Sequence, residues 1–189
     1  MSKRQDQRLS WFLVILCALG LGLAAFVVVA ERPGAIGHPS PQVQRLLPKV
    51  ARYLEVKQGG GTRRTADGWW VFCGLRYMGN SPVGTRFHLY VWEACQEYRA
   101  EGRRLRQFTG WSVPAVISVA KTKSGYRPVG ERQPGDGDYY APDIHRMFPS
   151  SAEKAIWKLA DGTGTGPGTV SALFANLRRR ARRELLVTG

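Results

Sequence analysis

Histidine and cysteine are both scarce in this chain of 189 residues, which contains three of each. The histidines His38, His88 and His145 are scattered, and their spacing does not bring a nucleophile, a base and an orienting acid together. The glycine run GTGTGPG lacks the Lys-Ser/Thr ending and the preceding strand that a phosphate-binding P-loop requires. We therefore predict no catalytic residues, no metal site and no cofactor, and we do not expect the chain to be an enzyme.

Acidic residues are also few: 14 stand against 28 basic ones, and the formal net charge is +14. A cationic surface attracts anionic partners such as lipid headgroups, anionic wall polymers or nucleic acid. A basic surface that is simply solvated, without a dedicated partner, is an equal alternative. The net charge therefore indicates that any partner would be anionic, and it leaves the chemical class of that partner open.

Long apolar runs without charge are limited to one, LSWFLVILCALGLGLAAFVVVA, at residues 9–30. Roughly 20 apolar residues in a helix cross a bilayer core, so this run is long enough to span. The tail before it, residues 1–8, has three basic residues and one acid, and the positive-inside rule then places it in the cytoplasm. A cleaved signal peptide is the alternative, although its apolar core is usually shorter. We predict an uncleaved signal-anchor in the cell membrane, with the main domain extracytoplasmic.

Proline and glycine divide the rest of the chain. Residues 31–41 form a Pro/Gly-rich spacer, and residues 161–169 (DGTGTGPGT) form a flexible linker. Between them, residues 42–160 have the alternation of apolar and polar residues expected of a folded domain. After the linker, residues 170–187 have the pattern of an amphipathic basic helix.

The folded domain begins with a helical pattern, in which Val43, Leu46, Val50 and Leu54 recur at helical spacing. Pro48 interrupts this pattern, because proline lacks the N–H of a helical hydrogen bond. We expect a kinked helix or two short ones.

Strand patterns follow, rich in aromatic and β-branched residues. The predicted strands are residues 69–78, 85–98, 111–121 and 126–132, with a further short element at 102–108. Two short helices come next, around 144–148 and over 151–160, the second capped by Ser150 or Ser151. The elements predict an α+β fold: an antiparallel sheet of about four strands, one face of which is covered by the helices. The element order is similar to that of cystatin-like folds, by analogy only.

Cys73 and Cys95 form the only cysteine pair beyond the apolar run. Outside the cell they could form a disulfide, whereas in the cytoplasm they would stay thiols. A hairpin turn within residues 79–84 places Cys73 opposite a residue near position 90, too far from Cys95 for a bond at about 3.3 Å per residue. The disulfide is therefore one possibility, and free thiols are the other.

The stretch LYVWEACQEY places Glu93, Cys95 and Glu97 on one side of a strand. Two carboxylates and a thiolate would be an uncommon mixture of hard and soft metal ligands. We favour a structural role, in which the acids pair with basic residues of neighbouring strands, such as Arg76 and Lys121.

An extracytoplasmic hydrolase or metal-dependent enzyme is the alternative function. It would use Glu93 and Glu97 together with Asp136 or Asp138 of the loop PGDGDYYAPD. The loop lacks the glutamate that completes an EF-hand, and Asp-Gly pairs are typical of turns. Convergence of these carboxylates in one cleft would favour the enzyme.

The C-terminal helix carries the clearest candidate binding residues, which are Arg178, Arg179, Arg180, Arg182 and Arg183. Its apolar side could enter a membrane interface, with arginines attracted to anionic lipid or a wall polymer. The apolar side could equally pack on the folded domain, with the arginines in water. A protein partner is a third alternative, and nucleic acid is unlikely for an exported domain.

A resemblance accompanies this pattern. The motifs WVFCGLRYMG, LYVWEACQEY, GWSVPAVISV and PGDGDYYAPDIHRMFP, in that order within residues 69–148, resemble an uncharacterised family of small exported or membrane-anchored proteins of Gram-positive bacteria. The resemblance covers under half of the chain and implies an exported domain. The family has no assigned activity, so the resemblance supplies no catalytic residues, and the arginine helix lies outside it.

Overall fold

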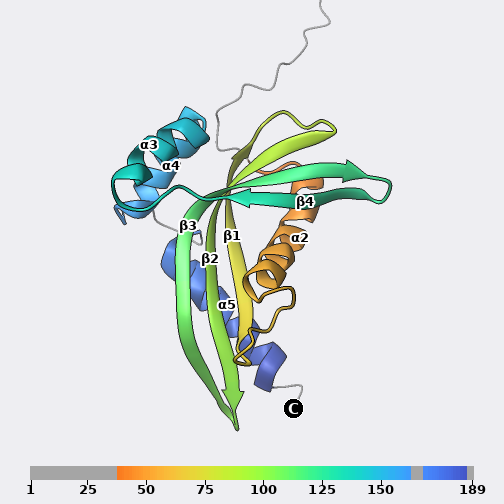
Figure 1. The fold of residues 1–189 in the computed structure, drawn as a ribbon, viewed down its shortest axis with the longest axis vertical. Coiled ribbons are helices and arrows are strands. Elements are labelled where there is room, and N and C mark those ends of the chain that lie inside the picture. The colour runs from red at the N-terminus through yellow and green to blue at the C-terminus, as the bar shows by residue number, and fades with distance from the viewer. Residues whose placement is uncertain (1–37, 163–167, 187–189) are drawn as a thin grey trace, which may run out of the picture. The chain divides into compact units, whose positions relative to one another are not determined.

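The computed structural model describes residues 38–162 and 168–186. Four strands form one antiparallel sheet whose spatial order follows the chain (Figure 1). The strands are β1 (Trp70–Asn80), β2 (Arg86–Glu101), β3 (Arg104–Thr122) and β4 (Gly125–Arg132). The helices are α2 (Pro41–Gln58), the 3₁₀ turn η1 (Gly137–Tyr139), α3 (Tyr140–Met147), α4 (Ser150–Ala160) and α5 (Val170–Leu186). The predicted α+β fold with about four antiparallel strands is confirmed.

Several predicted segments lie outside the described residues. These are the tail at 1–8, the anchor at 9–30, most of the spacer at 31–41 and the middle of the linker at 161–169. Among the helices that the structure describes, none is both long and apolar enough to cross a membrane.

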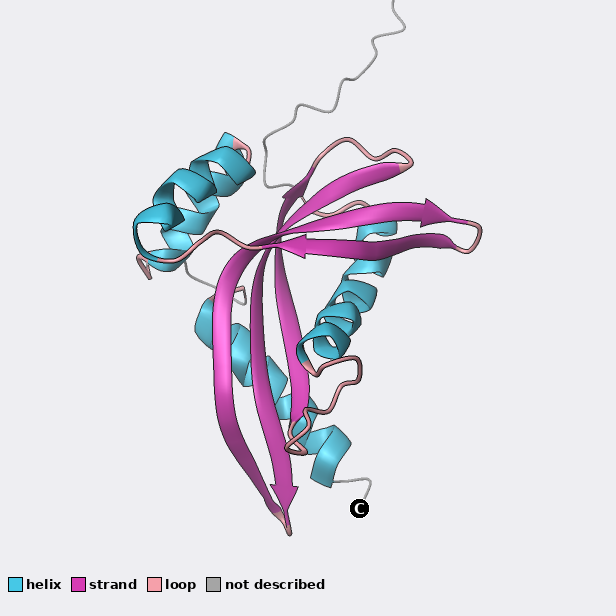
Figure 2. Ribbon diagram, in the orientation of Figure 1, coloured by secondary structure: helices cyan, strands magenta, loops and turns pink. Residues whose placement is uncertain are grey.

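The sheet separates two apolar layers, because successive residues of a strand point to opposite faces. In β2, Leu89 and Val91 pack with the buried side of α2, whereas Trp92 and Tyr98 pack with α3, α4 and α5. Figure 2 shows these helices around the sheet. We expected all helices to cover the same face, and this expectation was wrong. Along β2, the residues that point to one face and those that point to the other are both apolar, so both faces of the sheet must be covered.

Helix α2 is a single helix of 18 residues, with Pro48 inside it. The alternative of two short helices was wrong: the four apolar residues of the pattern all lie buried on one side of this helix, against the sheet. A proline inside a helix costs about 3 kcal/mol. Burying a Leu or Val side chain contributes about 1.5–3 kcal/mol, so four of them offset that cost. The Ser40 hydroxyl accepts a hydrogen bond from the Val43 N–H and caps the helix start.

Strands β1 and β2 place Cys73 directly opposite Cys95, and a disulfide joins them. The predicted register, which put a residue near 90 opposite Cys73, was wrong. Strand β1 runs on to Asn80, which pairs with Leu89, so the turn lies further along the chain than expected. Moving the centre of a hairpin turn by one residue changes the partner across the hairpin by two. A small error in the turn therefore became a five-residue error at Cys73.

Strand β3 is continuous over 19 residues, whereas the sequence predicted two elements, at 102–108 and 111–121. The two predicted elements meet at Gly110. A larger residue would not fit there, because a Cβ would lie 2.4 Å from Gln96 Oε1. The Gln96 amide donates a hydrogen bond of 2.6 Å to the Thr109 carbonyl, beside a register shift between β2 and β3. Strand β1 pairs with β2 as far as Tyr98, and from there β2 and β3 continue as a two-stranded arm.

Helices α3 and α4 confirm the two predicted short helices, and both contribute to the layer that contains α5. Phe148, between them, lies 5.9 Å from the ring of Tyr90 on β2. The predicted cap by Ser150 or Ser151 was wrong: α4 begins after Pro149, which makes no side-chain capping bond. Proline already supplies the extended backbone that a helix start needs.

Candidate anion-binding pocket

Helix α5 packs on the sheet through its apolar side. Leu173, Leu177 and Ala181 are buried there, and Gly74 of β1 lets the helix approach, since a Cβ at Gly74 would lie 3.2 Å from Leu177. The Thr169 hydroxyl accepts a hydrogen bond from the Ala172 N–H at the helix start. The sheet thus occupies the apolar side that would otherwise enter a membrane. The structure therefore has the predicted alternative in which the apolar side of this helix packs on the folded domain.

This packing divides the five candidate arginines into separate groups, because consecutive helical residues point in different directions. Arg178, Arg179 and Arg182 line a pocket between the helix and the arm of β2 and β3. Arg180 reaches the edge of the sheet and is half-buried. Arg183 is exposed and does not line the pocket. The structure therefore gives no single five-arginine patch.

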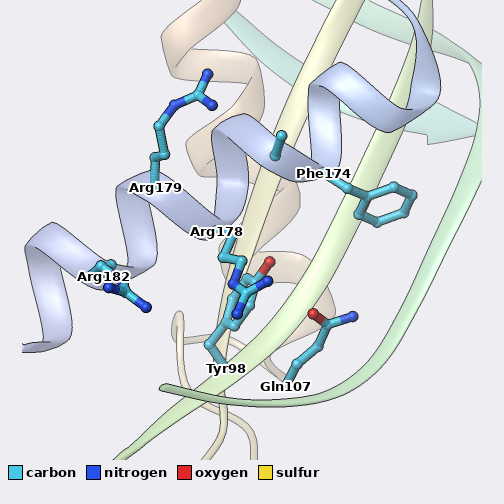
Figure 3. Close-up of a pocket in the computed structure, with 7 residues that line it drawn as sticks. Tyr98, Gln107, Phe174, Arg178, Arg179 and Arg182 are labelled. Atoms are coloured by element: carbon cyan, nitrogen blue, oxygen red, sulfur yellow. The ribbon is translucent and has the colours of Figure 1, made fainter. Parts of the chain in front are cut away.

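The pocket has a volume of about 540 Å³. It is lined by Tyr98, Gln107, Phe174, Ala175, Arg178, Arg179 and Arg182. Figure 3 shows Arg178 reaching from the helix to Tyr98, with Gln107 beside them, while Arg179 points away from Tyr98. Tyr98 and Gln107 are partners across β2 and β3. The walls therefore come from α5 on one side and from the arm on the other.

The arginines of this pocket have no anionic partner within the described part of the chain. None of the ion pairs there includes Arg178, Arg179 or Arg182, and no acid lines the pocket. Arg179 donates a hydrogen bond to the Asn176 side chain. A guanidinium group is always charged, and its planar fork matches the oxygens of phosphate or carboxylate. The pocket thus offers donors suited to an anion.

The rest of the lining is mostly apolar. Tyr98 is nearly buried, and its ring meets Phe72 edge-on with 5.8 Å between centroids. Burial raises the pKa of Tyr98 and nearby Arg178 lowers it, with the rise larger, so its phenol stays neutral. Gln107 donates a hydrogen bond to Gln96 Oε1, which fixes its amide. Phe174 completes the apolar wall.

Arg180 has a structural role. Its guanidinium pairs with Glu55 of α2, donates a 3.2 Å hydrogen bond to the Cys73 carbonyl and lies 4.9 Å from the centroid of the Phe72 ring. The Cys73 N–H donates to Glu55 Oε1 at 3.1 Å. β1 is an edge strand, whose outward N–H and C=O groups need partners. Glu55 and Arg180 together satisfy these groups at Cys73.

Arg63 adds a second cation to this network. Its Nε lies 2.7 Å from Glu55 Oε2, and its Nη1 lies 2.8 Å from Glu184 Oε2. Sequence reasoning missed Glu55, although it follows Leu54 at the border of the apolar side of α2, a position where a carboxylate is unusual. That position was the only signal available.

The two acids of the LYVWEACQEY stretch lie among different neighbours. Glu93 is fully buried and accepts a 2.8 Å hydrogen bond from Gln133 Nε2, which also donates to Glu131. Burial, followed by the adjacent Glu131 carboxylate, raises the pKa of Glu93 to about 8. Burial and the charge of Asp67 raise the pKa of Glu97. The expected pairing of these acids with strand cations does not describe Glu93.

The acids of the alternative enzyme site come from two parts of the chain, strand β2 and the loop after β4. Asp136 precedes η1 and Asp138 lies within it, in the loop after β4. Among the described residues, no three His, Cys, Asp or Glu side chains form a group that could hold a metal ion. A second, smaller pocket of about 220 Å³ lies beside the Glu131–Gln133 pair. That pocket is lined by Lys57, Gln58, Glu131 and Gln133.

Comparison of the chain with protein-family models, curated proteins and solved structures found no match. Tyr98, Gln107 and Phe174, which complete the arginine pocket, were not predicted from the sequence. Their convergence depends on the register of the arm and on the docking of α5, neither of which a linear pattern specifies.

Proposed function

We propose that this protein is a single-pass, membrane-anchored domain outside the cytoplasmic membrane, and that it binds an anionic ligand in the pocket beneath α5. The observation that carries the binding proposal is the set of three arginines at this pocket without an acidic partner among the described residues. Anionic lipid headgroups and anionic wall polymers are the ligand sources expected at a cell envelope. Binding, rather than catalysis, is the proposed activity.

The extracytoplasmic location is supported by two independent features. Residues 9–30 are long and apolar enough to span a bilayer, and the basic tail favours a cytoplasmic N-terminus. The Cys73–Cys95 disulfide is compatible with an oxidising compartment, since cytosolic thiols are mostly kept reduced. A disulfide also gives no support to an inward-facing domain that meets nucleic acid.

The proposal extends to the type of fold. Helix α2 followed by a four-stranded meander is similar in element order to cystatin-like folds, and the predicted anchor at 9–30 would precede it. The resemblance of residues 69–148 to small exported proteins of Gram-positive bacteria agrees with this arrangement. Neither supplies a ligand, so the ligand class depends on the pocket alone.

Protease treatment of intact protoplasts tests the location. We expect the full chain to fractionate with membranes and its main domain to be digested by protease added from outside. A domain that is protected in intact protoplasts, and digested only after lysis, would contradict the topology. A freely soluble product in the cytosol would contradict the anchor as well.

Calorimetric titration tests the binding. The full chain in a neutral detergent should bind glycerol 3-phosphate, with affinity that falls as salt rises. Arg178→Gln should weaken binding at least fivefold, whereas Arg183→Gln, the same charge change on the same helix outside the pocket, should stay within twofold. Equal effects of the two substitutions, or no binding at all, would reject the pocket as an anion site.

A further inference from the structure

We infer that the pocket beneath α5 takes a phosphate ester that carries an apolar group, so that one end of the ligand is anionic and the other is hydrocarbon. The inference rests on the proposed function and narrows its ligand class. It follows from the uneven lining of the pocket, in which cationic and apolar residues occupy different places.

The cationic part of the lining comes from one side of one helix. Arg178 and Arg182 are four residues apart on α5, so their side chains are neighbours. Two guanidinium groups at this spacing can donate several hydrogen bonds to the oxygens of one phosphate group. Glu184, the nearest acid along the helix, is paired with Arg63 and Arg180 instead.

The apolar part lies N-terminal to these arginines. Phe174 and Ala175 line the pocket one turn before Arg178, and the Tyr98 ring forms part of the opposite wall. Figure 3 shows the Phe174 ring projecting from the helix on the side away from Arg182. A hydrophilic polymer would leave this wall in contact with water. A hydrocarbon group attached to the phosphate would cover it.

The dimensions agree with a small ligand of this kind. Pockets for small molecules are typically 300–1,000 Å³ and combine apolar walls with a few placed polar groups. The pocket of about 540 Å³ falls in this range. Its polar groups include the guanidinium groups of Arg178 and Arg182, the Gln107 amide and the Tyr98 phenol, all of which can donate to phosphate oxygens.

The test compares hexyl phosphate with glycerol 3-phosphate by calorimetry, using the full chain in neutral detergent. Hexyl phosphate should bind at least tenfold more tightly, which corresponds to burial of about two methylene groups. Phe174→Ser should remove most of this difference, because it should weaken hexyl phosphate more than glycerol 3-phosphate. Hexanol should not bind, because it lacks the anion.

Ala175→Glu provides a second variant that does not disturb the core, since Ala175 is exposed. A glutamate there lies three and four residues before Arg178 and Arg179, and should pair with them and weaken both phosphate esters at least fivefold. Arg183→Gln is the matched control and should change neither affinity by more than twofold.

Equal affinities for hexyl phosphate and glycerol 3-phosphate would overturn the inference while leaving the proposed anion site intact. A hexyl preference that survives Phe174→Ser undiminished would also overturn it, because the hydrocarbon would then lie elsewhere. Loss of all phosphate binding would instead reject the proposed function. Dodecyl phosphate, held in a neutral-lipid nanodisc with the anchored chain, distinguishes the sources: competition with hexyl phosphate indicates a lipid, and its absence a soluble ester.

Discussion

Two glutamates are buried, Glu55 on α2 and Glu93 on β2, and they differ in the charge of the groups around them. Glu55 of α2 is 2% exposed and lies within 4 Å of guanidinium groups of Arg52, Arg63 and Arg180. Glu93 of β2 is 0% exposed, and it accepts a hydrogen bond from the neutral amide of Gln133. No ion pair within the described part of the chain includes Glu93.

The difference shows two ways in which one fold accommodates a buried carboxyl group. A buried charge is costly unless it is paired and hydrogen-bonded. Glu55 meets this condition with cations from α2, α5 and the loop before β1. Glu93 has a second acid, Glu131, beside it, and keeps its proton at neutral pH because burial raises its pKa to about 8. The first glutamate joins elements through charge, and the second is accommodated as a neutral acid.

The same comparison separates the arginines of α5. Arg180 pairs with Glu55 and donates to the Cys73 carbonyl, whereas Arg178 and Arg182 line a pocket that contains no acidic residue. A substitution at Arg180 should therefore affect folding, and a substitution at Arg178 should affect binding. The two outcomes distinguish a structural cation from a functional one on the same helix.

The largest effect is expected from Arg180→Met. This change leaves the Cys73 carbonyl without its donor and removes one cation from Glu55. Arg63 still pairs with Glu55, so we expect a cost of about 3 kcal/mol, the low end for breaking a buried pair. Denaturation of the full chain by urea in neutral detergent at pH 7 measures the free energy of unfolding.

Arg183→Met is the control for this measurement, since Arg183 is exposed on the same helix. Its substitution should change the free energy of unfolding by less than about 0.5 kcal/mol. If the two variants were equally stable, the Glu55–Arg180 pair would not hold α5 to the edge of β1, and the comparison with Glu93 would lose its basis.

The sequence predicted the elements of this fold better than their contacts. Helical spacing in α2 and strand alternation in β2 depend on neighbouring residues, which a linear pattern contains. The apolar side of α5, with Leu173 and Leu177, was identifiable for the same reason. The face of the sheet that each helix covers was not predicted correctly, because alternation indicates two faces and does not say which element covers each.

The candidate site was predictable in part. The arginines of α5 stood out by composition, but the separation of Arg180 from Arg178 depends on Glu55, which lies 125 residues earlier in the chain. The disulfide likewise depended on a hairpin register that a linear sequence does not fix. Both failures concern pairings across long sequence separations, for which this chain has no local signal.

A smaller effect, which depends on pH, is expected from Glu93→Gln. Because the pKa of Glu93 is about 8 in the folded protein and about 4.5 in the unfolded chain, the folded state holds its proton more tightly. This contribution is fully present below pH 4.5 and is lost as pH rises through 8, so the native protein should lose about 2 kcal/mol of unfolding free energy between pH 6 and pH 8. Glutamine stays neutral, and the variant should lack this loss.

Urea denaturation of the full chain at pH 6, 7 and 8 measures this slope, with Glu101→Gln as the control because Glu101 is exposed. The slope of the control should equal that of the native protein. The native slope should also change little between low and high salt, since buried charges are screened much less than exposed ones. A native protein equally stable at pH 6 and pH 8 would mean that Glu93 is charged in the fold. The contrast between a paired and a neutral buried glutamate would then be lost.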